Sequence, residues 1–207
     1  MSHTVSARFL FDFGSPNAYL AHQVLPEIEA RAGVSFERVP ILLGGLFKLA
    51  GNRSPVETFA NVPARRAYDM LEMQRFIARH GIEHFRMNPF FPVNTLQVMR
   101  GAVAAQQLGC FVPYENAVFA AMWERGLNMA DPEVIARTLA EAGLDAAALV
   151  AATQDPAVKE RLLANTQSAF ERGAFGAPTF FVGDEIFFGK DRLREVEEEI
   201  VRQQSGP

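Results

Sequence analysis

Ser15 stands where an apolar run ends and a helix is predicted to begin, a position at which a hydroxyl can do chemistry. Residues 6–13 have the composition of a short buried strand, Gly14 ends it, and Ser15-Pro16 has the pattern of a helix N-cap followed by proline. The N-terminus of a helix carries unpaired N–H groups and partial positive charge, so it attracts anions. A serine hydroxyl there can donate a hydrogen bond to a thiolate. Taken alone, a Ser-Pro pair more often marks only an N-cap worth about 1 kcal/mol.

Three further segments hold residues of the kind that bind small molecules. GAFGAPT at 173–179 places Pro178 directly before a predicted strand, although most X-Pro bonds in folded proteins are trans. FGKDR at 188–192 contains Asp191, which fits either a carboxylate that complements a helix dipole or a partner for a ligand ammonium. KLAGNRSP at 48–55 has the composition of a turn.

The elements predicted around these segments run strand, helix, strand, helical block, helix, strand, strand, helix. The strands are predicted over 6–13, 34–39, 179–182 and 185–188. The helices are predicted from Pro16 to near Gly33 and over 65–80, 95–108, 113–124, 132–142, 146–152, 156–172 and 191–203. Since open α/β sheets bind ligands beyond the carboxyl ends of their strands, Ser15 is expected at such an edge. The block from Gly44 to about Asn165 is expected to be an insertion.

Composition excludes several classes of partner. The 207 residues are 49% hydrophobic and 21% charged, with a net charge of -4 and dispersed basic residues, so nucleic-acid binding is not expected. The start of the chain has no secretory signal pattern. The most apolar stretch, Val39–Phe47, is far shorter than the roughly 20 residues that cross a bilayer, so no membrane span is expected.

The cysteine and histidine content restricts the chemistry further. Cys110 is the only cysteine, which excludes an intrachain disulfide or a C-x-x-C pair and favours a cytoplasmic protein. His80 and His84 are four residues apart, but Gly81 interrupts the helix and no third ligand is near in sequence, so no metal site is expected. Motifs for nucleotide, NAD or conventional hydrolase chemistry do not occur.

FDFGSPNAYLA at 11–21, GNRSP at 51–55, GAFGAP at 173–178 and FGKDR at 188–192 together resemble the kappa-class glutathione transferases and their bacterial relatives, the 2-hydroxychromene-2-carboxylate isomerases. The resemblance covers nearly the whole chain. It implies an α/β, thioredoxin-like fold with an inserted all-helical domain, as in the DsbA oxidoreductases. The thioredoxin-like domain would cover 1–44 and 166–207, and the helical insertion 45–165. The resemblance also implies a homodimer.

The resemblance implies glutathione as the cofactor, with Ser15 as the catalytic residue that holds its sulfur in place of a redox cysteine. Ala177, beside a cis Pro178, would pair with the cysteinyl backbone. The other glutathione-binding residues implied are Asn52, Phe188, Gly189, Lys190 and Asp191. Lys190 departs from the serine or asparagine that the family often has, and its charge fits poorly beside a ligand ammonium unless its side chain turns away.

The implied isomerase reaction is reversible thiolate addition to a conjugated aromatic pyruvate, bond rotation and elimination. Such a substrate carries a flat ring and a carboxylate, so apolar walls and a cation are needed. The predicted substrate-binding residues are Lys48, Arg53, Asn94 and Trp123. Two alternatives stay open: a kappa-like transferase that conjugates glutathione to electrophiles, and a thioredoxin-fold module that binds glutathione without chemistry.

Overall fold

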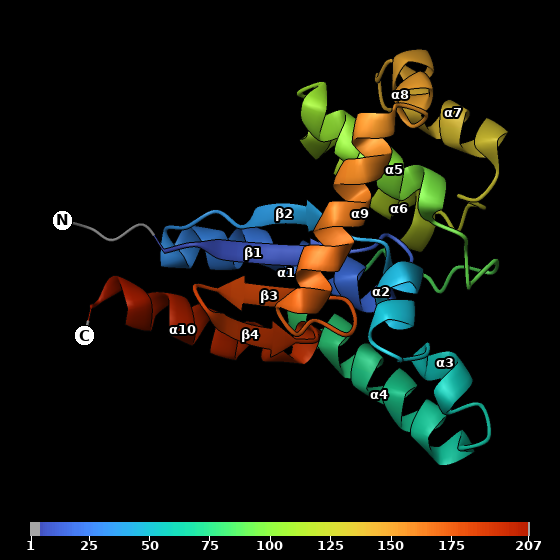
Figure 1. Ribbon diagram of the computed structural model, residues 1–207. Helices are drawn as coiled ribbons and strands as arrows, with labels where there is room; N and C mark the ends of the chain where they lie inside the picture. The colour runs from blue at the N-terminus through green and yellow to red at the C-terminus, as the bar shows by residue number, and fades with distance from the viewer. Residues whose placement is uncertain (1–4, 207) are drawn as a thin grey trace.

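The computed structural model describes residues 5–206 as a four-stranded sheet flanked by helices (Figure 1). The strands are β1 (Ala7–Phe11), β2 (Glu37–Pro40), β3 (Thr179–Val182) and β4 (Glu185–Phe188). Their order is β2-β1-β3-β4, with β1 and β2 parallel and the other neighbours antiparallel. The order of elements along the chain, with two strands before the helical block and two after it, is as predicted. Residues 1–4, where the absence of a leader was predicted, and residue 207 lie outside the described part.

Three helices flank the sheet. They are α1 (Pro16–Ala32), α9 (Pro156–Glu171) and α10 (Leu193–Gln204), the last preceded by the 3-10 turn η1 (Lys190–Arg192). In Figure 1, α9 crosses the face of the sheet opposite the one that α1 covers. Ser15 caps α1 by accepting a hydrogen bond from the Ala18 N–H, and Gly33 ends the helix at a φ of 64°.

The segment between β2 and α9 contains helices and no strand, as predicted. Its helices are α2 (Leu43–Leu49), α3 (Pro55–Thr58), α4 (Pro63–His80), α5 (Leu96–Gln107), α6 (Phe111–Trp123), α7 (Pro132–Glu141) and α8 (Ala146–Ala152). Two of them, α2 and α3, were not predicted. Figure 1 shows α5 to α8 gathered at one end of the sheet and α3 with most of α4 extending away from it. Within residues 5–206, no helix combines the length and apolar character needed to cross a membrane.

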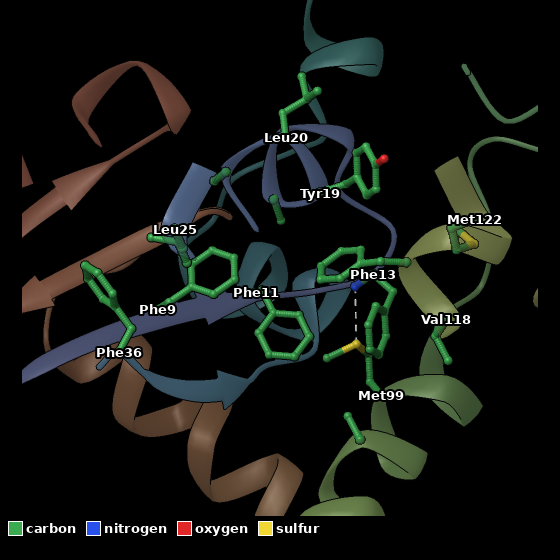
Figure 2. Close-up of a cluster of buried hydrophobic side chains, with 14 of the residues drawn as sticks. Phe9, Phe11, Phe13, Tyr19, Leu20, Leu25, Phe36, Met99, Val118 and Met122 are labelled. Carbon is green, nitrogen blue, oxygen red and sulfur yellow. Dashed lines mark hydrogen bonds between the residues drawn. The ribbon is translucent and has the colours of Figure 1, made fainter. Parts of the chain in front are cut away.

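A large hydrophobic cluster runs through the sheet and the helical segment, and a smaller one contains Leu10, Leu46 and Phe181. Phe9, Phe11 and Phe13 are fully buried and pack with α1 on one side and with α5 and α6 on the other (Figure 2). The Phe13 N–H points to the sulfur of Met99 on α5 at 3.3 Å, and the Trp123 indole N–H donates to the Phe13 carbonyl at 2.8 Å. The core therefore crosses the predicted domain boundaries, which stay a prediction.

A buried polar cluster joins α1, β2 and α6. Glu115 on α6 lies 3.7 Å from Nε of Arg38 on β2 and 3.7 Å from Nδ1 of His22 on α1. Arg38 also pairs with Glu29 at 2.9 Å. Burial raises the pKa of Glu115 to about 7 despite the nearby guanidinium of Arg38, whereas burial and Arg38 lower the pKa of His22 to about 4.

Candidate active site

The Ser15 hydroxyl bridges the start of α1 and the loop before β3. Its Oγ accepts from the Ala18 N–H at 3.1 Å and donates to the Ala177 carbonyl at 3.0 Å, while the Ser15 N–H donates to the Asp12 carbonyl at 3.0 Å. Ser15 is 5% exposed. The hydroxyl is therefore fixed at a positively polarised helix entrance, facing a backbone carbonyl.

The loop that faces Ser15 contains a cis peptide between Ala177 and Pro178. The sequence left the isomer at Pro178 open, and the structure has the cis form that the resemblance implied. The Pro178 carbonyl accepts from the Gly189 N–H at 2.9 Å, so segments 173–178 and 188–192 lie side by side. Three of the four motifs singled out in the sequence thus meet at one edge of the sheet.

The fourth motif joins the same loop through Asn52. Its Nδ2 donates to the carbonyl of Phe175 at 2.9 Å. The rings of Phe175 and Phe188 lie 4.5 Å apart and are each 43% exposed, so they form an apolar wall open to solvent. Gly176 is needed between them, because a Cβ there would come within 2.7 Å of the Phe188 ring.

Lys190 turns away from solvent and pairs with its neighbour. Its side chain is 4% exposed, its Nζ lies 2.5 Å from Oδ1 of Asp191, and it sits 4.9 Å above the ring of Phe76 on α4. The Asp191 side chain remains exposed. A ligand ammonium that approached Asp191 would therefore share this carboxylate with Lys190.

Three of the four predicted substrate-binding residues have exposed side chains. Lys48 and Arg53 are exposed, on α2 and just after it. Asn94 is exposed, accepts from the Leu96 N–H at 3.1 Å, and lines a separate hollow of about 290 Å³ together with Arg100. These three positions stay predictions.

Trp123, the fourth predicted substrate-binding residue, lies in the core. It is 0% exposed, its ring stacks on that of Phe85 with the centroids 6.1 Å apart, and its indole N–H donates to the Phe13 carbonyl. Its ring is a core residue that holds α6 to the end of β1. This placement gives no support to a contact between Trp123 and substrate.

Sequence reasoning missed Asp12, which lies directly beneath the Ser15 loop. It is 1% exposed; its Oδ1 accepts from the Gly14 N–H and its Oδ2 from the Leu43 N–H, both at 2.8 Å. Burial raises the pKa of Asp12, and these two bonds, with the side chain of Thr95, oppose that effect. The signal for it was an acidic residue inside an otherwise apolar strand run.

A larger hollow than the one beside Asn94 lies elsewhere. It measures about 580 Å³ and lies between β1, β2 and α9, where Arg8, Arg161 and Arg172 reach its rim. Neither Ser15 nor any other residue of the four motifs lines it. Size alone does not make a reactive site, and the polarised helix entrance, the cis proline and the apolar wall all meet at Ser15 instead.

The residues at the Ser15 edge suit the sulfur of glutathione better than they suit its ammonium group. A sulfur at Ser15 would replace the neutral Ala177 carbonyl as the acceptor of the hydroxyl, and hydrogen bonds to ionised acceptors are the stronger ones. The loop at Ala177 offers backbone for pairing with a peptide. At the ammonium end, Asp191 is accessible but already paired with Lys190.

Comparison with known proteins shows the family to which the chain is related. The DSBA-like thioredoxin domain family matches residues 8–201. A 2-hydroxychromene-2-carboxylate isomerase of Sphingobium xenophagum is 30% identical over 190 residues, covering 92% of this chain and 95% of that protein. The glutathione S-transferase kappa 1 of Caenorhabditis elegans is 25% identical and covers 96% of this chain and 92% of its own.

A solved structure has a similar fold. The structure of a 2-hydroxychromene-2-carboxylate isomerase superposes on this chain with a TM-score of 0.82 at 28% identity, and the match covers 95% of both chains. The family resemblance and the thioredoxin-like fold predicted from the sequence are thereby confirmed.

Proposed function

The chain belongs to the DSBA-like thioredoxin domain family, and from that premise we propose that it is a glutathione-dependent isomerase of an aromatic carboxylate. It is an enzyme of the group that contains the 2-hydroxychromene-2-carboxylate isomerases and the kappa glutathione transferases. The observation that carries the proposal is the Ser15 hydroxyl, fixed at the N-terminus of α1 and aimed at the carbonyl before the cis proline. Dithiol exchange has no second cysteine to use, since Cys110 is alone.

Ser15 acts in this proposal as a thiolate stabiliser. A free thiol titrates near 8.5, so only about 3% is ionised at neutral pH. A hydrogen bond to an ionised group is worth roughly 1.5–3 kcal/mol and a helix N-terminus about 0.3–1 kcal/mol more. After the loss of the bond to Ala177, of order 1 kcal/mol, a fall of about one to two pKa units remains.

When bound, glutathione supplies a sulfur nucleophile that adds reversibly to a conjugated carbon. Ser15 holds the charge of that sulfur, and Ala177 beside Pro178 aligns the peptide. Asn52 keeps the loop at Phe175 in place through its hydrogen bond. Lys48 and Arg53 are the proposed partners of the substrate carboxylate.

The test is the pKa of the thiol of bound glutathione, followed by thiolate absorbance near 240 nm in the wild type and in Ser15→Ala. We expect a depressed value in the wild type that rises by about one to two units in the variant. Asp145→Ala is the matched control, because Asp145 caps α8 by the same bond to the third amide at 3.0 Å. A bound thiol that titrates near 8.5 in the wild type refutes the proposal.

A kappa-like transferase is the second candidate, favoured by the similarity to glutathione S-transferase kappa 1. Product analysis separates the two functions. Isomerised substrate with an unchanged glutathione concentration supports the isomerase, and stoichiometric loss of glutathione supports the transferase. Binding of glutathione without turnover of any electrophile or chromene carboxylate would leave the third alternative, a binding module.

We also propose that the enzyme is a homodimer, as the resemblance implied, and that it is cytoplasmic. The cytoplasm suits a chain that depends on reduced glutathione and has one cysteine. Light scattering on the purified protein tests the dimer. A mass of a single chain at micromolar concentration would contradict it.

A further inference from the structure

Asp12 joins three segments that are distant in sequence. One carboxylate oxygen accepts from Gly14 in the loop that leads to Ser15, and the other accepts from Leu43, the first residue of α2. The side chain of Thr95, the residue directly before α5, lies against the same carboxylate. A Cβ on Gly14 would be 3.0 Å from Thr95 Cγ2 and 3.3 Å from Asp12 Oδ1, so this junction is tightly packed.

The two bonds of Asp12 replace caps that the local sequence lacks. The residue before α2 is Leu42, which has no side-chain acceptor, so Asp12 supplies one from another segment. Gly14, with no side chain of its own, is held by the same carboxylate. Both carboxylate oxygens of Asp12 accept a hydrogen bond. Asparagine has the same length but only one acceptor oxygen, so one of the two amides would face its NH₂ group.

The joined segments are those that carry the proposed glutathione site. The Gly14 loop carries Ser15, and α2 leads directly to Asn52, which holds the loop facing Ser15. The Ser15 N–H is itself bonded to the Asp12 carbonyl at 3.0 Å. Movement at Asp12 would therefore reach both sides of the site.

We propose that Asp12 is a positioning residue, which holds the Ser15 hydroxyl at the distance and direction that bind the glutathione sulfur. This inference rests on the proposed function. Asp12 does not touch the ligand; it acts through the Gly14 loop and the start of α2. The assignment gives a purpose to a buried carboxylate whose desolvation costs free energy.

The experiment compares the wild type with Asp12→Asn in two measurements: the thiol pKa of bound glutathione, and amide hydrogen exchange at Gly14, Ser15 and Leu43. We expect the thiol pKa to rise by about one unit, a tenfold loss of thiolate preference, and exchange at these amides to accelerate. Thr95→Val is a milder variant, expected to shift both readings in the same direction by less.

Asp131→Ala is the control for a purely structural effect. Asp131 caps α7 through the amides of Glu133 and Val134, so its removal costs a comparable cap without touching the Ser15 loop. Faster exchange in Asp12→Asn with an unchanged thiol pKa overturns the inference, because the site would not depend on the loop.

A fall in the thiol pKa of Asp12→Asn also overturns the inference, since Asp12 would then act by its charge rather than by position. A wild-type protein that does not bind glutathione refutes the proposed function, and the inference falls with it. These results are distinguishable, because only the last leaves no bound thiol to titrate in any variant.

Discussion

Replacing Glu115 by glutamine should change how the stability of the fold depends on pH. Glu115 is buried between Arg38 and His22, and its pKa is raised from 4.5 to about 7. A carboxyl with a raised pKa contributes stability that is fully present below pH 4.5 and is lost as the pH rises to about 7. At about 1.4 kcal/mol per unit, this shift amounts to roughly 3 kcal/mol.

His22 changes stability in the opposite direction. Its pKa is lowered from 6.5 to about 4, so its contribution is present above pH 6.5 and is lost as the pH falls through about 4. Between pH 4.5 and 6.5 the pH dependences of the two groups cancel. The pair binds one proton in each state, on Glu115 in the folded chain and on His22 in the unfolded chain. The wild type should therefore have a nearly flat contribution from this cluster in that window.

Glu115→Gln removes one side of this balance. The free energy of unfolding of the variant relative to the wild type should rise by roughly 3 kcal/mol between pH 4.5 and 7.5. Urea denaturation at pH 4.5, 5.5, 6.5 and 7.5 measures this difference. Glu160→Gln, on the exposed face of α9, is the control and should show a constant difference.

A difference between the wild type and Glu115→Gln that stays constant within about 0.5 kcal/mol over this range would refute the reasoning. The pKa of Glu115 would then be the same in the folded and unfolded chains. Burial beside His22, Arg38 and Glu29 would have no net effect on its ionisation. His22→Gln offers a cross-check, since it should leave a stability that falls between pH 4.5 and 7.

Two further predictions concern the charges around the site. Lys190→Met replaces the ammonium over the Phe76 ring with an apolar side chain and frees Asp191. Calorimetric titration should then give about twofold to fivefold tighter glutathione binding, whereas weaker binding would mean that Lys190 itself holds the ligand. Ser15→Cys, made in a Cys110→Ser background, should give a thiol that titrates at least about one unit below 8.5 without any ligand, and a value of 8.5 or above would show that this helix entrance does not stabilise a thiolate.

The parts of the fold with local signals were predicted from the sequence. Ser15-Pro16 predicted the start of α1 and Gly33 predicted its end. Each signal acts on a helix terminus only a few residues away, so it can be read from the local sequence. The strands flanking Gly183 were predicted to the residue for the same reason.

The missed helix α2 depends on contacts from distant segments. Its sequence, LGGLFKL, contains two glycines that argue against a helix. The structure stabilises its start through Asp12, which binds the Leu43 N–H, and through Thr166, which binds the Leu42 N–H at 2.9 Å. Neither partner is visible from a local pattern.

The site was predicted in part for a related reason. The motifs carrying Ser15, Asn52, Pro178 and Gly189 do meet, because each sits at the end of a strand or helix that the fold brings to one edge. The burial of Trp123 was not predicted from the sequence, because most residues of α6 are apolar and their helical periodicity is weak.

The residue just before Gly14 ties the reactive edge to the helices around it. Phe13 gives its N–H to Met99 and its carbonyl to Trp123, and both partners belong to the helical segment. During evolution, those helices could be replaced by others only if the new helices also brought a sulfur acceptor to the Phe13 N–H and an indole donor to the Phe13 carbonyl.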